Sequence, residues 1–275
     1  MKSKVMTMCL VMAVLAIGSA AQADYFNGFE TDIAGWDVFG GDYNASRVAS
    51  GTDGITSKTG AYHGKADSSL FPATNWGGYS SVFPAGGYIT SLDIYLGMAG
   101  DWNNDTRFDF TSAINNAAGN HRRDFAFNGG FYDDDGLGDR FIFSASNQTG
   151  RDNCYPEDPG HDPISITASG WYTFQHTFRD DGGVLAVDLA ILDSSSAVMG
   201  SWTLSDPLDL VGSGALDGEW NEEVQVGGNR YGWFGSNEFN VLAFDNTSLT
   251  IVPEPATLCL LGLGSLALIR RRKRA

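Results

Sequence analysis

The chain has 275 residues, with 17 Lys and Arg against 33 Asp and Glu, so its formal net charge is −16. An acidic chain repels the phosphate backbone, which excludes the usual electrostatic mode of nucleic-acid binding. The composition, with 35 Gly, 12% aromatic residues and only three Cys, is typical of a many-stranded β-protein without a disulfide framework.

The first 23 residues have the order of a secretory signal peptide. Two lysines precede an apolar run, and the small-x-small sequence Ala21-Gln22-Ala23 follows it. A membrane anchor is the alternative, but the run is shorter than the roughly 20 residues that span a bilayer. Signal peptidase is therefore expected to cut after Ala23 and to leave Asp24 as the new N-terminus.

The exported part is more acidic than the whole chain. Residues 24–252 hold 10 Lys and Arg against 32 Asp and Glu, a charge near −22, and they contain only Cys154. No intramolecular disulfide can form there, so a hydrophobic core must supply the stability. The length fits a single all-β domain, which we predict over residues 24–251.

Short segments with alternating apolar side chains follow one another along this domain. In Tyr88–Leu96 the alternation places Tyr88, Thr90, Leu92, Ile94 and Leu96 on one face, as in a half-buried strand. Further strands are predicted at residues 106–114, 125–131, 140–146, 171–179, 184–193, 198–204 and 241–251. Turn sequences at 180–183 and 194–196 join three of these into a meander. The acidic run 133–139 is interpreted as a solvated hairpin turn, because it lacks the terminal Glu of an EF-hand loop.

Seven tryptophans divide into two groups by their sequence context. Trp36, Trp171 and Trp202 are predicted to lie in the core. The others lie in Gly-rich and Asn-rich sequence, where an exposed indole can stack on the apolar face of a sugar ring. These candidates for glycan stacking are Trp76, Trp102, Trp220 and Trp233.

The last 24 residues combine three compositions in a fixed order. Val252-Pro253-Glu254-Pro255 resists helix formation, an apolar run to Ile269 is expected to form a short hydrophobic helix, and five basic residues end the chain. The basic run would stay cytoplasmic, so the domain before it faces outward. An ordinary C-terminal membrane anchor is the alternative interpretation.

This order resembles the PEP-CTERM sorting signal, with Pro253, Glu254 and Pro255 as its motif. The resemblance implies that residues 252–275 insert transiently into the membrane and are processed by an exosortase, a membrane protease. It also implies delivery to the cell surface or extracellular matrix of a Gram-negative-type bacterium that makes extracellular polysaccharide. The protein would be membrane-tethered until the tail is removed.

A second resemblance concerns the two ends of the domain. Phe26–Glu30 with Ala34-Gly35-Trp36, and the late Leu242–Asn246, look like the first and last strands of jelly-roll domains, which include concanavalin-like lectins and carbohydrate-binding modules. The resemblance implies a jelly-roll antiparallel β-sandwich in which the terminal strands lie side by side. It also implies a structural calcium ion held by Glu30 and Asp245, for which solvent-exposed strand caps are the alternative.

Enzymatic motifs are missing from the sequence. There is no Glu-x-Asp-x-x-Glu strand of the concanavalin-like glucanases, no metalloprotease motif and no nucleophile elbow. We therefore expect a non-catalytic surface or matrix protein associated with extracellular polysaccharide. A dedicated glycan-binding module is the first alternative, and a divergent polysaccharide-active enzyme with paired carboxylates is the second.

Overall fold

The structure is a computed structural model, which describes residues 24–67, 70–99, 102–133, 136–147, 156, 161–212, 225–237 and 241–254. Two short 3-10 turns, η1 (Gly41–Tyr43) and η2 (Thr52–Gly54), accompany the strands in this part of the chain. The strands are β1 (Tyr25–Asn27), β2 (Ser46–Ala49), β3 (Tyr62–Asp67), β4 (Ala73–Thr74), β5 (Tyr88–Leu96), β6 (Thr106–Asn116), β7 (His121–Tyr132), β8 (Arg140–Ser146), β9 (Ile164–Ile166), β10 (Gly170–Asp180), β11 (Val184–Leu192), β12 (Val198–Leu210), β13 (Val226–Asn237) and β14 (Val241–Ile251).

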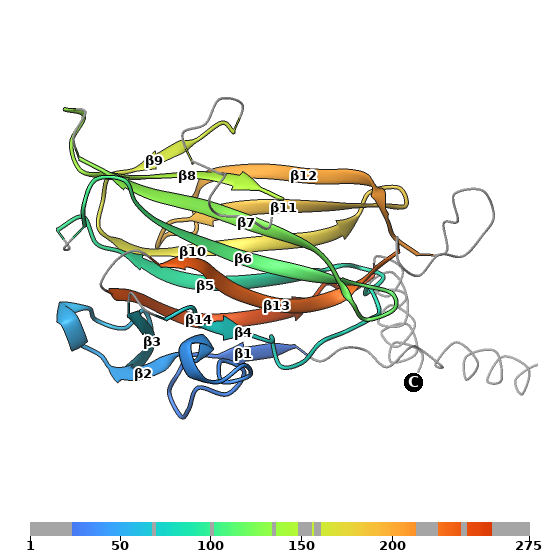
Figure 1. The fold of residues 1–275 in the computed structure, drawn as a ribbon, viewed down its shortest axis with the longest axis horizontal. Helices are drawn as coiled ribbons and strands as arrows, with labels where there is room; N and C mark the ends of the chain where they lie inside the picture. Colours follow the sequence, from blue (N-terminus) through green and yellow to red (C-terminus); the bar gives the residue numbers. More distant parts are fainter. Residues whose placement is uncertain are drawn as a thin grey trace, which may run out of the picture.

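These strands form two antiparallel sheets packed face to face (Figure 1). The eight-stranded sheet has the order β12-β11-β10-β5-β14-β3-β2, with β1 also paired to β14. The six-stranded sheet has the order β4-β13-β6-β7-β8-β9. The predicted jelly-roll β-sandwich is confirmed, including the first and last strands side by side. The predicted meander is also confirmed, as β10, β11 and β12. The predicted C-terminal helix lies outside the described residues.

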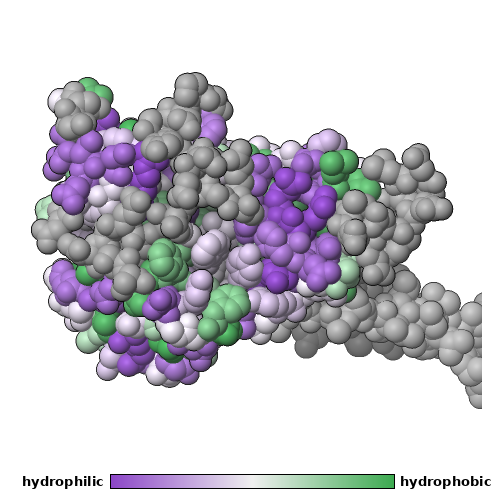
Figure 2. All heavy atoms as spheres, viewed as in Figure 1, coloured by the Kyte–Doolittle hydropathy of each residue, from purple (hydrophilic) through white to green (hydrophobic). Residues whose placement is uncertain are grey.

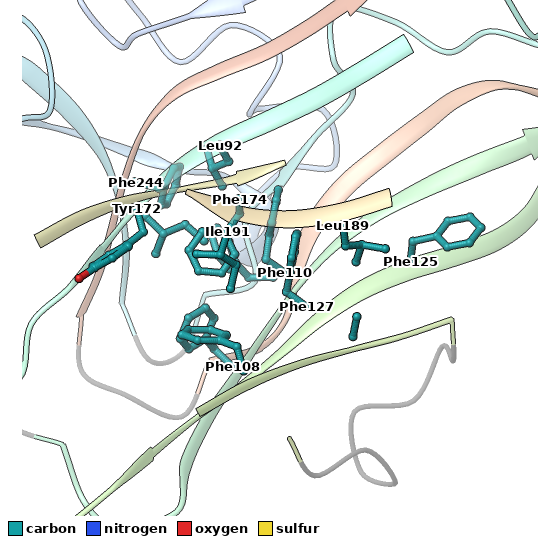
Figure 3. Packing of buried hydrophobic residues seen from close by; sticks show 14 of the residues in the cluster. Leu92, Phe108, Phe110, Phe125, Phe127, Tyr172, Phe174, Leu189, Ile191 and Phe244 are labelled. Atoms are coloured by element: carbon teal, nitrogen blue, oxygen red, sulfur yellow. The ribbon is translucent and has the colours of Figure 1, made fainter. Parts of the chain in front are cut away.

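The core between the sheets is largely aromatic (Figure 3). Alternation sends Phe108 and Phe110 of β6 and Phe125 and Phe127 of β7 inward, where each is at most 1% exposed. Phe127 meets Phe174 of β10 edge to face, with ring centroids 5.1 Å apart and planes at 89°. Such pairs each contribute about 0.5–1.5 kcal/mol beyond area burial. The face predicted for residues 88–96 is also buried, because Tyr88, Thr90, Leu92, Ile94 and Leu96 are all 0% exposed.

An ion-pair cluster fastens the six-stranded sheet to the edge of the other sheet. Asp209 of β12 is 1% exposed and accepts hydrogen bonds from the Nε atoms of Arg122 and Arg123 on β7, at 2.8 and 2.6 Å. Arg123 also donates to Asp206 at 2.7 Å. Because the charged groups are paired in good geometry, the buried carboxylate is tolerated.

The outer face of the eight-stranded sheet is covered by the segment that contains η2. Trp171 of β10 points outward there and donates through Nε1 to the carbonyl oxygen of Thr56, at 2.9 Å. The Ser57 hydroxyl lies 2.9 Å from Nδ1 of His63 on β3, and His63 is 1% exposed. The prediction that Trp171 lies in the core is therefore wrong, since the ring serves as an anchor for this segment. Trp36 is buried as predicted, and Trp202 is partly buried against the core.

Candidate functional site

One concave site of the described residues is an aromatic pocket on the outer side of β4 and β13. Its volume is about 300 Å³, and its walls are Phe39, Tyr43, Ala73, Tyr231 and Trp233. Because Phe234 of β13 points into the core, its neighbours Tyr231 and Trp233 alternate toward the opposite face. Two further walls come from the segment between β1 and β2.

That segment is a loop whose backbone is fastened at both sides. The Ala45 amide donates to the carbonyl oxygen of Trp36 at 3.2 Å, and the Phe71 amide donates to that of Asp42 at 2.6 Å. Gly40 and Gly41 take positive φ values of 68° and 57°, which favour glycine. The loop therefore holds Phe39 and Tyr43 beside β13 while leaving them 48% and 43% exposed.

The aromatic rings contact one another at steep angles. Phe39 lies 6.2 Å from Tyr231 and 5.9 Å from Tyr43, with both interplanar angles at 78°. Tyr231 lies 6.4 Å from Trp233, at 83°. Edge-to-face contacts are a favourable arrangement for aromatic pairs, so the rings support one another in these positions.

Tyr231 links the pocket to a polar rim. The His121 ring stacks on Tyr231 at 5.8 Å and 4°, and the Arg230 guanidinium lies 5.5 Å from the Tyr231 ring centre. Burial, reinforced by the negative charge of Asp124, raises the pKa of Tyr231 to about 12. The phenol therefore stays protonated at physiological pH, so it can both donate and accept a hydrogen bond.

Polar side chains continue from the pocket across the outer face of the six-stranded sheet. Asp109, Asn128 and Ser144 are consecutive cross-strand partners on β6, β7 and β8, and Asn128 Nδ2 donates to Asp109 Oδ1 at 3.0 Å. Within the described part of the chain, no hydrogen bond reaches Asn128 Oδ1, Ser144 Oγ, Ser146 Oγ or Trp233 Nε1. Buried polar atoms normally have partners, so these atoms are exceptions among the described residues, and their burial keeps them out of direct reach of a ligand.

The four tryptophans predicted to stack on a glycan lie in different environments. Trp233 lines the aromatic pocket. Trp76 is only 1% exposed, and its ring packs over Gly232 inside the domain. Trp102 is half-buried, stacks against Phe131 at 6.0 Å and donates to the carbonyl oxygen of Gly97. Trp220 lies outside the described residues. Trp233 is thus the member of this set that the structure places in a pocket.

The other pocket walls were missed by the sequence analysis, which gave no role to Phe39, Tyr43 or Tyr231. A signal for them was present, because Phe39-Gly40-Gly41-Asp42-Tyr43 places two aromatics around turn residues. What the sequence could not show is that this loop packs beside β13.

The two carboxylates predicted to bind calcium anchor the backbone before β3. Glu30 Oε1 accepts from the amides of Ala61 and Tyr62, at 2.9 and 3.1 Å. Asp245 is 0% exposed and accepts through Oδ2 from the amide of Thr59, at 3.1 Å. Burial raises the pKa of Asp245 to about 6.

Calcium requires further oxygen ligands, whereas these two side chains face N–H groups. The described residues also contain no group of three or more His, Cys, Asp or Glu around a metal-sized position. Two carboxylates alone do not complete a calcium coordination sphere of about six to eight oxygens. The calcium site stays a prediction.

The sorting motif begins where the domain ends. Val252 is half-buried directly after β14, and Pro253 and Glu254 are exposed. Pro255, like the signal peptidase site at Ala21 and Ala23, lies outside the described residues. No helix in the described ranges is long and apolar enough to cross a bilayer.

Comparison with known proteins bears on both the tail and the domain. Residues 252–274 match the model of the PEP-CTERM protein-sorting motif. The chain carries this sorting signal. The motif implies export, processing by an exosortase and sorting to the cell surface in bacteria.

A comparison with curated proteins gave no match. Among solved structures, the legume lectin-like domain from Entamoeba histolytica is similar at 11% identity, over 66% of this chain and 77% of that chain, with a TM-score of 0.36.

Proposed function

We propose that this chain is an exported, non-catalytic surface protein whose sandwich domain binds a neutral glycan of the extracellular matrix through the aromatic pocket. The observation that carries the proposal is the convergence of Phe39, Tyr43, Tyr231 and Trp233 on one cavity. A sugar ring presents an apolar C–H face to such rings, and its hydroxyls bond polar groups nearby. His121 and the protonated Tyr231 phenol provide polar groups at the rim.

The charge of the domain favours a neutral polysaccharide over an acidic one. The five described wall residues of the pocket carry no charge, with Arg230 at the rim beside Tyr231, and the exported part has a net charge near −22. A uronic-acid or sulfated polymer would approach against this field and would find no cationic wall in the pocket. A neutral glycan has neither penalty.

Delivery follows from the sorting signal. In a Gram-negative-type bacterium, signal peptidase would release Asp24, and the C-terminal segment would tether the domain to the membrane until the exosortase removes it. Glycan binding would then retain the processed protein in the polysaccharide layer. The sorting signal supports the delivery route, and the pocket supports the retention.

The proposal is tested on a glycan array with the exported protein. The variant Phe39→Ala, Tyr43→Ala removes two exposed rings from the pocket, and Phe26→Ala is the matched control because Phe26 is 67% exposed outside the pocket. Loss of aromatic stacking is expected to weaken binding by roughly tenfold or more, while the control binds like the wild type. Wild-type binding to no glycan, or equal binding by the pocket variant, would refute the site.

The enzymatic alternative has its own test. Asp109 and Asp124 lie on the same outer face as the pocket, but Asp124 is opposite Ala113, four residues along β6 from Asp109, roughly 13 Å at 3.3 Å per residue. The carboxylate pairs of glycoside hydrolysis lie closer together. We expect no release of reducing ends from any glycan that binds. Release that is lost in Asp109→Asn or Asp124→Asn would replace the non-catalytic proposal with a hydrolase.

A further inference from the structure

The domain is closed at the point where the sorting motif begins. β1 pairs antiparallel with β14, with Tyr25 opposite Leu249 and Asn27 opposite Thr247. Beyond this pairing, Asp24 Oδ1 accepts a hydrogen bond of 2.8 Å from the amide of Ile251. The expected first residue of the exported protein thus holds the last residue of the last strand.

The next residue is held from the other side. The Val252 amide donates to the carbonyl oxygen of Gly87, at 3.0 Å. Gly86 permits this approach, since a Cβ at that position would overlap the carbonyl oxygen of Val252. We call these contacts of Asp24, Gly86 and Gly87 with Ile251 and Val252 the clasp.

The clasp ends abruptly at Pro253. Proline has no N–H group, so the chain cannot make the next backbone bond, and Pro253 and Glu254 are both exposed. The sorting motif, which starts at Val252, therefore has its first residue bonded within the domain and its next two residues exposed. No spacer separates the folded edge from the processing motif.

We propose that the clasp fixes where the tail is cut: the processing protease finds a chain that is folded through Val252 and extended from Pro253, so the cut lies C-terminal to Val252. A protease needs an extended substrate, and a bond inside a hydrogen-bonded strand is cleaved only after local opening. Hydrolysis adds the hydroxyl of water to the new C-terminal carboxyl and its proton to the amine of the released tail. Asp24 is a positioning residue, because it acts through Ile251.

This proposal rests on the proposed export and tail processing, and it adds a role for the residue that signal peptidase is expected to leave first. Asp24 makes its bond through the side chain, so the clasp can close whether or not the leader is still attached. The closed clasp then defines the edge that the processing protease meets.

The test uses the full chain in a bacterium that has the processing protease, with intact-mass measurement of both termini. Asp24→Ala removes the acceptor for Ile251, and Asp24→Asn retains an oxygen acceptor. Gly86→Ala displaces Val252, and Gly170→Ala is its control, since an added Cβ there meets its nearest atom at an ordinary 3.9 Å. The N-terminal mass shows that signal removal is unchanged, and the melting temperature shows that each variant folds.

In the wild type we expect a single C-terminus at Val252 or beyond it. In Asp24→Ala and Gly86→Ala, loosening of the clasp is expected to raise the fraction of chains that end within residues 249–251 about fivefold. Asp24→Asn and Gly170→Ala should match the wild type. A wild-type cut before Val252, or unchanged ends in both clasp variants, would overturn the inference while leaving the sorting function intact. A tail that stays uncut in the wild type would overturn both.

Discussion

His176 of β10 provides a test of how the core responds to acid. Its side chain is 0% exposed and lies between the rings of Phe110 and Phe127, with centroids 5.7 and 4.8 Å away. The Nε2 atom lies 3.0 Å from the carbonyl oxygen of Phe125. Burial lowers the pKa of His176 to about 3, against a smaller opposite effect of this hydrogen bond.

The sign of the effect follows from proton binding. An unfolded histidine has a pKa of about 6.5, so between that pH and about pH 3 the unfolded chain holds a proton that the folded chain lacks. The unfolding free energy therefore falls as the pH is lowered, by about 1.4 kcal/mol per pH unit. At pH 5 the loss is about 2 kcal/mol, a large part of the 5–15 kcal/mol that stabilises a typical domain.

Urea unfolding of the exported protein between about pH 7.5 and about pH 5 measures this slope. In His176→Gln the side-chain amide can still donate to the carbonyl oxygen of Phe125, but the titrating group is gone. The fall in unfolding free energy between these two pH values should therefore be about 2 kcal/mol smaller than in the wild type, whatever the absolute stability of the variant.

Asp245→Asn should act oppositely. Burial raises the pKa of Asp245 to about 6 from 3.8, so between these pH values the folded state binds a proton that the unfolded chain lacks. This proton binding adds to the unfolding free energy of the wild type as the pH falls. Asp245→Asn removes that contribution, so its unfolding free energy should fall more steeply in acid than that of the wild type. An unchanged pH dependence in His176→Gln would refute the reasoning.

Three further predictions concern stability. Asp209→Asn removes a carboxylate that pairs with both Arg122 and Arg123, and it should lower the unfolding free energy by about 3 kcal/mol. Urea unfolding measures this change, and a loss below about 1 kcal/mol would show that the two ion pairs contribute little to stability. Gly232→Ala places a Cβ against the Trp76 ring and should cost about 1–3 kcal/mol, whereas Gly170→Ala should be nearly neutral; similar melting temperatures for the two would contradict this packing. Because Glu30 and Asp245 face amide N–H groups, a chelator should leave the melting temperature unchanged, and a fall of several degrees would support the calcium prediction instead.

The strands with regular alternation were predictable because each has one buried face. The segments observed as β5 and β8 have the predicted bounds, and β6 and β7 extend the predicted strands by a few residues. Their side chains alternate between the aromatic core and the outer face, so local sequence determines which way they point. The hairpin turns carry Gly and Asp at positions that such turns require.

β13 was not predicted, and its sequence explains why. Gly227, Gly228, Gly232 and Gly235 interrupt the apolar pattern, and glycine inside a strand normally weakens it. At Gly232 the ring of Trp76, more than 150 residues earlier, occupies the space of a side chain, and at Gly228 it is Ser80 and Val82. The pairing with β6 also shifts register three times. These requirements are tertiary, so they cannot be read from local periodicity. The pocket on β13 was missed for the same reason.

The positions of the pocket and the clasp allow both to act at once. The start of β13, at Val226–Gly228, lies beside the segment Ser80–Val82. That segment leads into the turn that contains Gly87, whose carbonyl oxygen accepts the hydrogen bond from Val252. The start of β13 is therefore at the end of the sandwich where the tail leaves the domain. Figure 1 shows the N-terminal end of β1 and the C-terminal end of β14 at this same end.

Trp233 is seven residues beyond Val226 along β13, roughly 23 Å at 3.3 Å per extended residue. A domain held by its tail at the membrane would therefore present the pocket on its side, away from the attachment point. Among the coloured residues of the face drawn in Figure 2, hydrophobic groups form small separate areas between hydrophilic ones. Glycan capture and tail removal are then independent in space, so a pocket variant should still be sorted and cut, and a clasp variant should still bind glycan.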